Sequence, residues 1–561
     1  MDLEKESKAV DLSHHLSVVS RARKTSPLKG LQKYFVKPGM LSLAGGLPSP
    51  AYFPFSSISA DVLVTESFAV VPDEQSSTFS WFWKLFGSGP STKEKTTTVT
   101  IPKYPTNPGD INLAAALQYG AAVAQTPLQE FIKNFVTQVY QPAYDDFSVL
   151  IHTGNTDGWN RIVATLCNPG EGVLTEEWTY PSAMSAMAPY GINPVPIAMD
   201  SQGMRADSLN TLLSEWDEEA RHMKRPHVMY IVPVGQNPKG TTMGVARKKE
   251  IYEICVKYVV DIIIAEDDPY YFLQMGLFVP KGERSMSAIA STSTQKDEPW
   301  CQVLISMWLR YDYEGRVIRL DTFSKTIAPG SRLGWFTCNP LFAERLERQG
   351  ETSTQAPCGF GQVNQINQFT ELLWLTWIKS LITRALLHWK YEGYIRWLRG
   401  LGAEYEIRRN FFIDCLAEEF LLQKGVGTSG VWRGCNVYRA SAKNKKQLMQ
   451  EKYAVERDTM FSFIPPTAGM FVWMKLHLEN HPSFAQEDGE TLEMKLWTQV
   501  AEAGVLFGPG WMFAPDAFST SVMEENEVGH FRISFSNSEF ADLKKAVTIF
   551  GRVIREFFAK A

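Results

Sequence analysis

The stretch DTFSKTIAPGSRLGW at residues 321–335 places a lysine between hydroxyl side chains and an arginine. Lys325 lies between Ser324 and a Pro-Gly turn, and Arg332 follows seven positions later. A lysine whose ammonium is desolvated or lies among other cations has a lowered pKa and can form an imine with a carbonyl group. Thr322, Ser324 and Arg332 could bind the oxygens of a phosphate. The stretch therefore predicts a site for pyridoxal 5′-phosphate, with an ordinary solvated loop as the alternative.

Composition indicates a packed globular protein without a general affinity for nucleic acid. The 561 residues are 44% hydrophobic and 21% charged, and the net charge of -5 offers no basic surface to a phosphate backbone. Length predicts about three to four domain-sized units, or two closely joined domains with insertions. The seven cysteines lack C-x-x-C spacing, and an odd number cannot all pair, so we expect reduced thiols and a cytoplasmic protein.

No targeting or membrane segment is expected. The beginning of the chain, MDLEKESKAVDLSHH, is polar and carries acids, unlike a secretory signal or a mitochondrial presequence. The most membrane-like segment, residues 369–389, is interrupted by Glu371, Lys379 and Arg384, so it lacks the roughly 18 apolar residues of a spanning helix. We expect a buried or interface helix there and no association with a membrane.

Short apolar runs alternate with amphipathic stretches from about residue 115 onward. FSVLIHTG, HVMYIVPVG, VVDIIIAEDD and GRVIRLDTFSK end in turn residues and precede helical periodicity. A parallel sheet covered by helices on both faces produces this pattern. Beyond about residue 395 the pattern becomes mixed, and AGMFVWMKL and HFRISFSN are interpreted as strands. The prediction is an α/β protein with a smaller α+β domain.

Irregular segments interrupt this pattern. Residues 1–40 are polar and are interpreted as an arm, and the Gly and Pro residues of LSLAGGLPSPAYFPF, 41–55, predict a rigid loop. Residues 72–109 are rich in Ser, Thr, Pro and Lys and are predicted to be a surface insertion with little regular structure. Residues 281–299 are predicted to be a second insertion.

Polar motifs follow the predicted strands, where ligands of open α/β sheets bind. GNTDG at 154–158 follows VLIHT and opens a helix, so Asn155, Thr156 and backbone N–H groups could hold a phosphate. In GQNPKG at 235–240, Asn237 precedes a proline, which favours extended geometry and aims its amide across the strand ends. Either motif on its own also fits an ordinary turn.

The acidic motif EDDPYY at 266–271 follows a fully apolar strand. A carboxylate there is costly to bury unless it is paired, and a pyridinium N–H would pair with Asp267. Tyr270 could reach the phenolic oxygen of the same ring. A helix N-cap followed by proline would explain Asp268, but it would not require Asp267.

Two further side chains fit a ring and its substrate. Tyr180, just past GVLTEE, could stack on a flat ring, although a core or interface position is the alternative. In HFRISFS, strand alternation separates Arg532 from Phe531 and Ile533, so Arg532 is the only cation on its face. This arrangement suits bidentate capture of a carboxylate, with a surface salt bridge as the alternative.

Together, these motifs resemble those of the fold-type I pyridoxal-phosphate-dependent aminotransferases of class I/II. Within that group the chain resembles the fungal aromatic amino acid aminotransferases and the kynurenine/2-aminoadipate aminotransferases. The resemblance is most specific in SLAGGLPSPAYFPF, QNPKG, EDDPYYFLQ, DTFSKTIAPGSRLGW, TAGMFVW and FRISFS. It implies a large domain over residues 106–395 with a mainly parallel seven-stranded sheet, a small domain over 396–561, and an arm over 1–60 that contributes to the small domain.

The resemblance also implies roles for individual residues. The catalytic set comprises the Schiff-base lysine, the partner of the pyridine nitrogen and a ligand of the phenolic oxygen: Lys325, Asp267 and Tyr270. The substrate-binding set comprises the carboxylate arginine, a residue of the N-terminal loop and a residue of the QNPKG motif: Arg532, Gly46 and Asn237.

The cofactor itself is expected to contact a wider group. Phosphate ligands would come from three segments and, through Tyr119 of LQYG, from the neighbouring subunit of a homodimer. The phosphate turn departs from the family, which usually has Ser-Gln where this chain has Asn155-Thr156. The full set of expected contacts is Asn155, Thr156, Tyr180, Asn237, Asp267, Tyr270, Thr322, Ser324, Lys325, Arg332 and Tyr119.

The implied function is transfer of the amino group of an aromatic or related L-amino acid to a 2-oxo acid. The alternatives are a 2-aminoadipate or kynurenine transaminase and another pyridoxal-phosphate-dependent lyase in secondary metabolism. A ligand-sensing regulator of this fold would need a DNA-binding module within the first 40 or so residues, which are polar. A catalytically dead homologue is disfavoured because Lys325, Asp267, Asn237 and Arg332 are all present. No metal site is expected, and the preferred amino acid rests on the resemblance alone.

Overall fold

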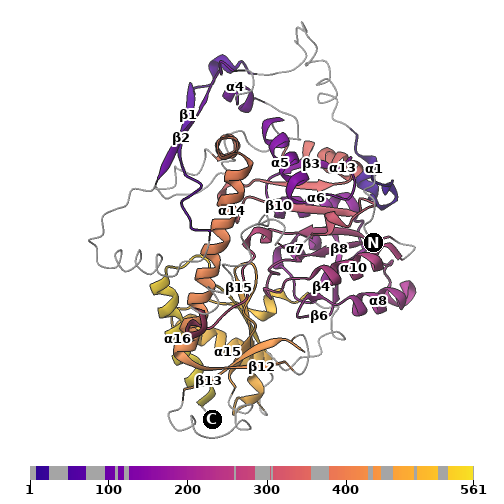
Figure 1. The fold of residues 1–561 in the computed structure, drawn as a ribbon. Helices are drawn as coiled ribbons and strands as arrows, with labels where there is room; N and C mark the ends of the chain where they lie inside the picture. Colours follow the sequence, from indigo (N-terminus) through magenta and orange to yellow (C-terminus); the bar gives the residue numbers. More distant parts are fainter. Residues whose placement is uncertain are drawn as a thin grey trace.

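The two largest sheets among the described residues belong to a large and a small domain. In a computed structural model, the described residues are 8–24, 48–70, 95–107, 111–118, 126–257, 261–284, 304, 307–355, 378–427, 432, 434–443, 459–484, 489–515 and 529–559. Their elements form a seven-stranded sheet, a six-stranded sheet and two small two-stranded ribbons. Figure 1 shows the large domain above the small one, with a long helix running between them.

The large domain is built on a sheet with strand order β3-β11-β10-β9-β8-β4-β5. Strands β10, β9, β8, β4 and β5 run parallel, whereas β11 runs antiparallel to both β10 and β3. The mainly parallel seven-stranded sheet expected from the sequence is thereby confirmed. Its strands are β3 (Ser148–His152), β4 (Gly172–Glu176), β5 (Asn193–Ile197), β8 (Val228–Ile231), β9 (Ile263–Asp267), β10 (Val317–Thr322) and β11 (Gly334–Cys338).

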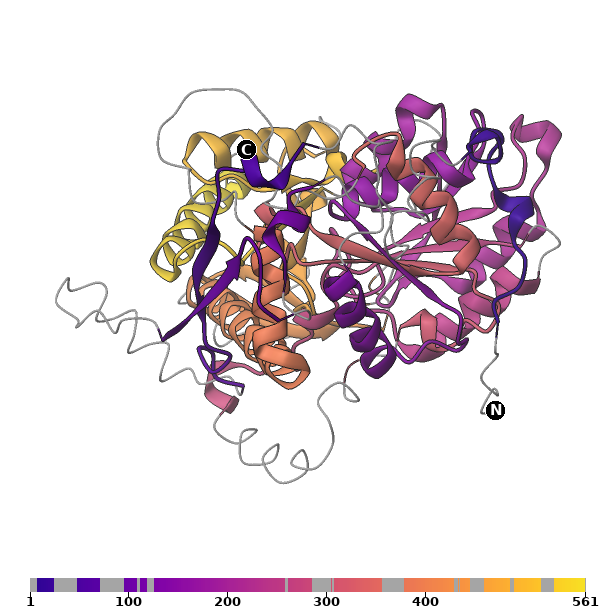
Figure 2. The same ribbon diagram turned by 90° about the horizontal axis from the view of Figure 1, so that it is seen from above.

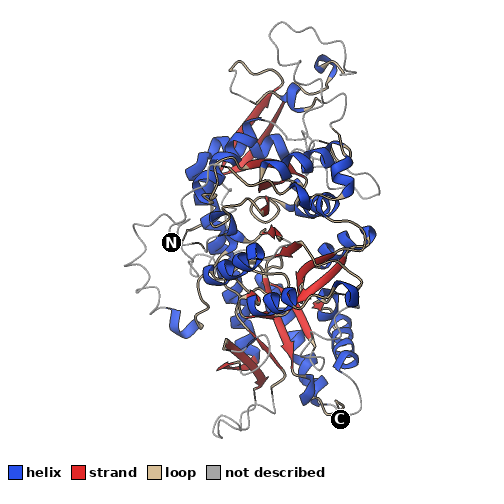
Figure 3. Cartoon of the chain, turned by 90° about the vertical axis from the view of Figure 1, so that its right-hand side faces the viewer, coloured by secondary structure: helices blue, strands red, loops and turns tan. Residues whose placement is uncertain are grey.

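Helices cover both faces of this sheet, as Figures 2 and 3 show. Burial on both faces explains the continuous apolar runs, since neighbouring residues such as Ile263 and Ile264 are both fully buried. One face is covered by α5 (Thr126–Val139), α8 (Ala206–Ser214), α10 (Val245–Lys257) and the first part of α14 (Ile378–Glu419). The other is covered by α6 (Asn155–Leu166), α7 (Pro181–Met187) and α13 (Pro340–Glu351).

The large domain also contains one short helix and one short two-stranded ribbon. They do not change the order of the strands, and two of their residues, Met199 and Met204, are buried. They are α9 (Glu218–Arg221) and a two-stranded ribbon of β6 (Met199–Asp200) and β7 (Gly203–Met204).

The described part of the N-terminal arm packs on the large domain. It contains a short helix, α1 (Val18–Ala22), and it buries Leu12 and Leu16 in the same apolar cluster as α6. The hydroxyl of Ser17 donates to the carbonyl of Ala164 at 3.0 Å. This placement differs from the sequence interpretation, which assigned the arm to the small domain. Residues 25–47 of the arm lie outside the described residues.

A two-stranded antiparallel sheet contradicts the prediction of little regular structure for one part of residues 72–109, of which 72–94 and 108–109 lie outside the described residues. Strand β1 (Ser57–Leu63) pairs antiparallel with β2 (Thr96–Pro102). The segment TTTVTIP is rich in β-branched residues, and its alternate side chains Val99 and Ile101 are buried. Ile101 packs with Ile58 and with the short helix α4 (Leu113–Ala116), beside the upper end of α14 in Figure 1. The prediction was wrong for β2 because it rested on the Ser, Thr, Pro and Lys content of the segment and not on the alternation of apolar residues in TTTVTIP.

The small domain is an antiparallel sheet packed against helices. Its strand order is β12-β13-β14-β15-β17-β16, and all neighbouring pairs are antiparallel. The predicted strands AGMFVWMKL and HFRISFSN are β15 and β17, so the α+β character is confirmed. The elements are β12 (Phe420–Val426), β13 (Asn436–Ala442), β14 (Phe461–Phe463), β15 (Phe471–Leu476), β16 (Gly508–Pro509), β17 (His530–Ser534), α15 (Gly489–Glu502) and α16 (Phe540–Ala559).

Helix α14 runs from the large domain into the small domain, and residues 395 and 396, where the sequence interpretation placed the domain boundary, lie within it. Its backbone is non-helical at Lys390, where φ is 57°. Tyr394 and Leu398 pack in the core of the large domain, whereas Ile413 and Leu416 pack in the core of the small domain. The domains are therefore connected through a helix rather than through a flexible linker. No helix within the described ranges is long and apolar enough to cross a membrane.

Candidate active site

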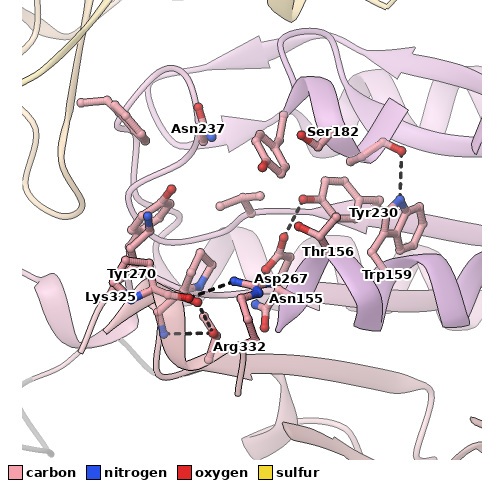
Figure 4. Close-up of a pocket in the computed structure, with 18 of the residues that line it drawn as sticks. Asn155, Thr156, Trp159, Ser182, Tyr230, Asn237, Asp267, Tyr270, Lys325 and Arg332 are labelled. Atoms are coloured by element: carbon pink, nitrogen blue, oxygen red, sulfur yellow. Dashed lines mark hydrogen bonds between the residues drawn. The ribbon is translucent and has the colours of Figure 1, made fainter. Parts of the chain in front are cut away.

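A pocket of about 320 Å³ lies where the carboxyl ends of β8, β9 and β10 face the small domain. Phe471 of β15 and Arg532 of β17 close it from the small-domain side. Figure 4 shows polar side chains from several elements pointing into it. Gly46 and Tyr119 lie outside the described residues. Eleven of the thirteen predicted site residues line the pocket: Asn155, Thr156, Tyr180, Asn237, Asp267, Tyr270, Thr322, Ser324, Lys325, Arg332 and Arg532.

Lys325 lies in the connection over residues 323–333 that joins β10 to its antiparallel neighbour β11. Burial lowers the pKa of its ammonium, and the charges of Arg532 and Arg332 lower it further. Among the described residues it makes no ion pair. The neutral amine that a nucleophile or a general base requires is therefore more accessible here than in a solvated lysine.

An anion-binding cradle lies next to this lysine, at the N-terminus of α6. Gly154 precedes that helix with φ of 102°, and a methyl group added to it would overlap the guanidinium of Arg332. Only glycine therefore lets the guanidinium lie against the helix terminus. The hydroxyl oxygens of Thr322 and Ser324 lie 2.8 Å apart beside it. A cation, two hydroxyl groups and a helix N-terminus together fit a phosphate.

Asp267 is the carboxylate of this pocket, and its partners are neutral. The Asn155 side-chain amide donates to Oδ1 at 2.6 Å, and the Tyr230 hydroxyl donates to Oδ2 at 2.6 Å. Burial raises the pKa of Asp267, while these hydrogen bonds and the charge of Arg319 act in the opposite direction. In the described part of the chain it makes no ion pair. A buried carboxylate whose hydrogen-bond donors are neutral is suited to accept a hydrogen bond from a cationic N–H group of a ligand.

The side chain of Asn155 contacts Asp267 and not the site expected for the phosphate. Its amide group was expected to contact phosphate, but it donates to Asp267 and, at 3.2 Å, to the carbonyl of Leu320. Thr156 also lines the pocket. The phosphate contribution of this turn would therefore come from backbone N–H groups and Thr156 rather than from the Asn155 amide.

Tyr230 is the main site residue that the sequence reasoning missed. It lies on β8, and its backbone position pairs with Ala265 of β9. In the run HVMYIVPVG it looked like one more apolar core residue. The available signal was its hydroxyl, because a buried tyrosine usually finds a hydrogen-bond partner.

Arg532 forms the opposite end of the pocket. Its Nη1 donates to Asn237 Oδ1 at 2.8 Å, and its guanidinium lies 4.3 Å and 4.7 Å from the ring centroids of Phe471 and Phe513. The predicted alternation is confirmed, because Phe531 is fully buried in the small-domain core. The Nε atom of Arg532 is buried without a hydrogen-bond partner. This planar, partly desolvated cation suits a carboxylate ligand.

Aromatic side chains occupy the space between the two cationic ends. Tyr180, at the start of α7, and Tyr270 both line the pocket. Burial raises the pKa of Tyr270, so its hydroxyl stays protonated and can donate. Its ring lies edge-on to Phe471, with centroids 5.9 Å apart. A flat ring thus fits between a phosphate cradle, a carboxylate and an arginine, which are the groups that pyridoxal 5′-phosphate and an amino acid require.

Comparison with known proteins gives consistent matches over nearly the whole chain. The family profile of aminotransferase class I and II matches residues 114–379. An aromatic amino acid aminotransferase of Schizosaccharomyces pombe is 33% identical over 556 residues, which cover 98% of either chain. An L-tyrosine:2-oxoglutarate aminotransferase of Serpula lacrymans is 30% identical, covering 99% of this chain and 98% of its own. The crystal structure of aminotransferase Aro8 from Candida albicans is 31% identical, with a TM-score of 0.78 over 99% of this chain and 100% of that one.

Proposed function

Because the chain belongs to the aminotransferase class I and II family, we propose that the pocket around Lys325 transfers the amino group of an aromatic L-amino acid to a 2-oxo acid. Family membership confirms the predicted fold type I and the cofactor, pyridoxal 5′-phosphate, and the protein is an aminotransferase. The observation that carries the site assignment is the convergence of eleven predicted residues in one pocket. The aromatic preference is supported by the names of two relatives.

The cofactor would be held at three points. Arg332, Ser324 and the N-terminus of α6 would bind its phosphate, and Asp267 would accept a hydrogen bond from its ring nitrogen. Lys325 would bond its aldehyde carbon through the side-chain nitrogen. When bound, the cofactor supplies the electron sink for negative charge that develops at the α-carbon of the substrate.

The remaining chemistry belongs to the protein's own side chains. Arg532 would bind the substrate carboxylate and thereby orient the α-carbon toward Lys325. Once the substrate amino group has replaced Lys325 at the cofactor's aldehyde carbon, the freed amine of Lys325 would take the α-proton as a base and return a proton as an acid, a role that its lowered pKa favours. Tyr270 and Asn237 would face the phenolic oxygen of the ring, and Tyr180 would stack on it.

A substrate panel tests the proposed activity. Purified enzyme would be assayed with phenylalanine, tyrosine, tryptophan, kynurenine and 2-aminoadipate, each with several 2-oxo acids. We expect the highest kcat/KM for an aromatic amino acid and no turnover without a 2-oxo acid. A preference for kynurenine or 2-aminoadipate would favour the first alternative. Turnover that proceeds without any 2-oxo acid would favour a lyase.

We also propose a homodimer whose two sites each use Tyr119 of the neighbouring subunit. The support is the family position of LQYG, because Tyr119 itself lies outside the described residues. Inactive Tyr119 and Lys325 variants, mixed under conditions that exchange subunits, should recover activity, since one site of each mixed dimer regains both native residues. A fully active monomer, or no recovery despite proven exchange, would contradict shared sites.

A cytoplasmic location is part of the same proposal. The cysteines among the described residues, Cys167, Cys255, Cys338, Cys415 and Cys435, are buried free thiols, which suits a reducing compartment. Fractionation of the source cells should recover the enzyme with cytosolic markers. Recovery with an organelle or in the medium would contradict the location.

A further inference from the structure

Tyr230 contacts the pocket carboxylate directly from the neighbouring strand. Its side chain is 1% exposed, and its hydroxyl lies 2.6 Å from Asp267 Oδ2. We propose that Tyr230 is a positioning residue that keeps Asp267 ionised and fixed in orientation, so that Asp267 can hold a proton on the cofactor's ring nitrogen. This inference rests on the proposed role of Asp267 and gives a role to a residue that had none in the sequence analysis or in the family resemblance.

Tyr230 can act only as a donor in this contact. Burial and the charge of Asp267 raise the pKa of its phenol well above the ordinary value, so the hydroxyl keeps its proton. The carboxylate is the acceptor. The Tyr230 ring lies 4.6 Å from the ring of Trp159, whose Nε1 donates to the carbonyl of Ala183 at 3.0 Å. Packing against an indole that is itself fixed by a hydrogen bond limits the tyrosine to one position (Figure 4).

Asp267 depends on neutral donors because it has no cationic partner in the described part of the chain. Its neighbour Asp268 instead pairs with Arg319 at 2.9 Å. Burial alone would favour the protonated form of Asp267, which could not hold a proton on the ring. Tyr230 and Asn155 donate to different carboxylate oxygens, so together they stabilise the charge and fix the plane of the group.

A matched pair of variants separates this role from simple packing. Tyr230→Phe removes one hydroxyl from a buried Tyr–Asp hydrogen bond in the pocket. Tyr252→Phe does the same elsewhere, because Tyr252 donates to Asp312 at 2.9 Å in the large-domain core. Both holoenzymes would be characterised by thermal unfolding, by kcat and KM, and by pH titration of the absorption of the bound cofactor.

We expect Tyr230→Phe to lower kcat roughly 10- to 100-fold, the effect of losing a hydrogen bond to a charged group, with KM changed less than about threefold. Loss of positive charge from the ring disfavours deprotonation of the nitrogen that links it to Lys325. The midpoint of the absorption titration should therefore move to higher pH. Tyr252→Phe should lower the unfolding temperature but leave kcat and the midpoint unchanged.

An unchanged midpoint in Tyr230→Phe, or an equal change in Tyr252→Phe, would overturn the proposal. A double-mutant cycle gives a second criterion: in an Asp267→Asn background, Tyr230→Phe should have little further effect on kcat and on the midpoint. An undiminished effect there would mean that Tyr230 does not act through Asp267. The absorption titration needs no substrate, so it tests Tyr230 even if the proposed aromatic specificity fails.

Discussion

Strands β9 and β10 bury charge on both of their faces, but the two faces balance it differently. On one side, here termed the ionic face, Glu266, Asp268 and Asp321 surround Arg319, whose guanidinium lies within 3.3 Å of an oxygen of each. On the other, the pocket face, Asp267 accepts hydrogen bonds from neutral donors only. Strand alternation puts neighbouring carboxylates of one motif on opposite sides.

This difference separates structural charge from functional charge. The Tyr140 hydroxyl donates to Asp321 at 2.8 Å, and the ammonium of the buried Lys248 lies near Glu266 and Asp268, so the carboxylates of the ionic face have their partners within the protein. The pocket is lined by three cations, Lys325, Arg332 and Arg532, and by Asp267, and among the described residues none of these four groups forms an ion pair. Changes on the ionic face should therefore alter folding, whereas changes on the pocket face should alter chemistry.

The largest expected difference is in kcat, between a substitution of Lys325 in the pocket and a substitution of Lys248 near the ionic face. Lys325→Ala removes the proposed base and cofactor attachment, so kcat should fall by at least roughly 10²- to 10⁴-fold while the unfolding temperature changes little. Lys248→Met removes a fully buried lysine near Glu266 and Asp268. Its folded fraction should keep kcat within a few-fold, although its stability changes. Steady-state kinetics and thermal unfolding of both variants provide the test, and equal losses of kcat would erase the distinction.

The neighbouring carboxylates give the next largest contrast. Asp267→Asn keeps the shape but removes the charge that holds the ring proton, so kcat should fall roughly 10²- to 10³-fold, and much more than cofactor retention. Asp268→Asn weakens the pair with Arg319, so it should cost about 1.5–3 kcal/mol of unfolding free energy with kcat preserved in the folded fraction. Denaturant titration and kinetics measure both. Near-normal turnover in Asp267→Asn would refute its role.

Two glycines sharpen the comparison at the phosphate end. Gly154→Ala and Gly170→Ala both place a side chain at positive φ, but only the first would displace Arg332, since nothing lies within 4 Å of a methyl group at Gly170. Both should lose about 1–2 kcal/mol of stability from backbone strain. Gly154→Ala should in addition lower cofactor affinity roughly 10-fold or more. If the two variants keep the same fraction of cofactor after dilution, the proposed binding of phosphate beside Gly154 is contradicted.

The smallest expected effect is a pH dependence of Lys325. Its pKa is lowered in the folded protein, by burial first and then by the charges of Arg532 and Arg332. The unfolded chain therefore binds more protons between the folded pKa and the ordinary value of 10.5, and stability should rise with pH in that window. Acylation of the apoenzyme, followed by mass spectrometry, should show a midpoint for Lys325 below 10.5. A midpoint at or above that value would contradict this electrostatic environment.

Much of the fold could be predicted from the local pattern of apolar residues, and the strands that were missed have physical reasons. The central strands are fully apolar and end in turns, so their type was readable from the sequence. Strand β5, NPVPI, was not predicted because its prolines lack backbone donors, a property tolerated at the edge of the sheet where it lies. Strand β2, which pairs with β1, was missed because its Thr-rich composition is typical of an insertion.

The site residues that could be predicted were those whose position is set by local sequence, and those that were missed depend on contacts between distant segments. Lys325, Asp267 and Arg532 stand at strand ends or alternate with core residues, so their exposure to a pocket could be inferred. Tyr230 looks apolar in its own strand, and only the alignment of β8 with β9 shows that its hydroxyl contacts Asp267. The amide of Asn155 could not be assigned to this carboxylate because the contact spans 112 positions of the chain.

The most direct test of the central claim is to find which lysine carries the cofactor. Borohydride reduction of the holoenzyme, followed by proteolysis and mass spectrometry, would identify the modified residue. The structure predicts a single pyridoxyl adduct on Lys325, in the peptide that contains DTFSKTIAPGSR. An adduct on any other lysine, with Lys325 unmodified, would contradict the assignment of the pocket face as the active site.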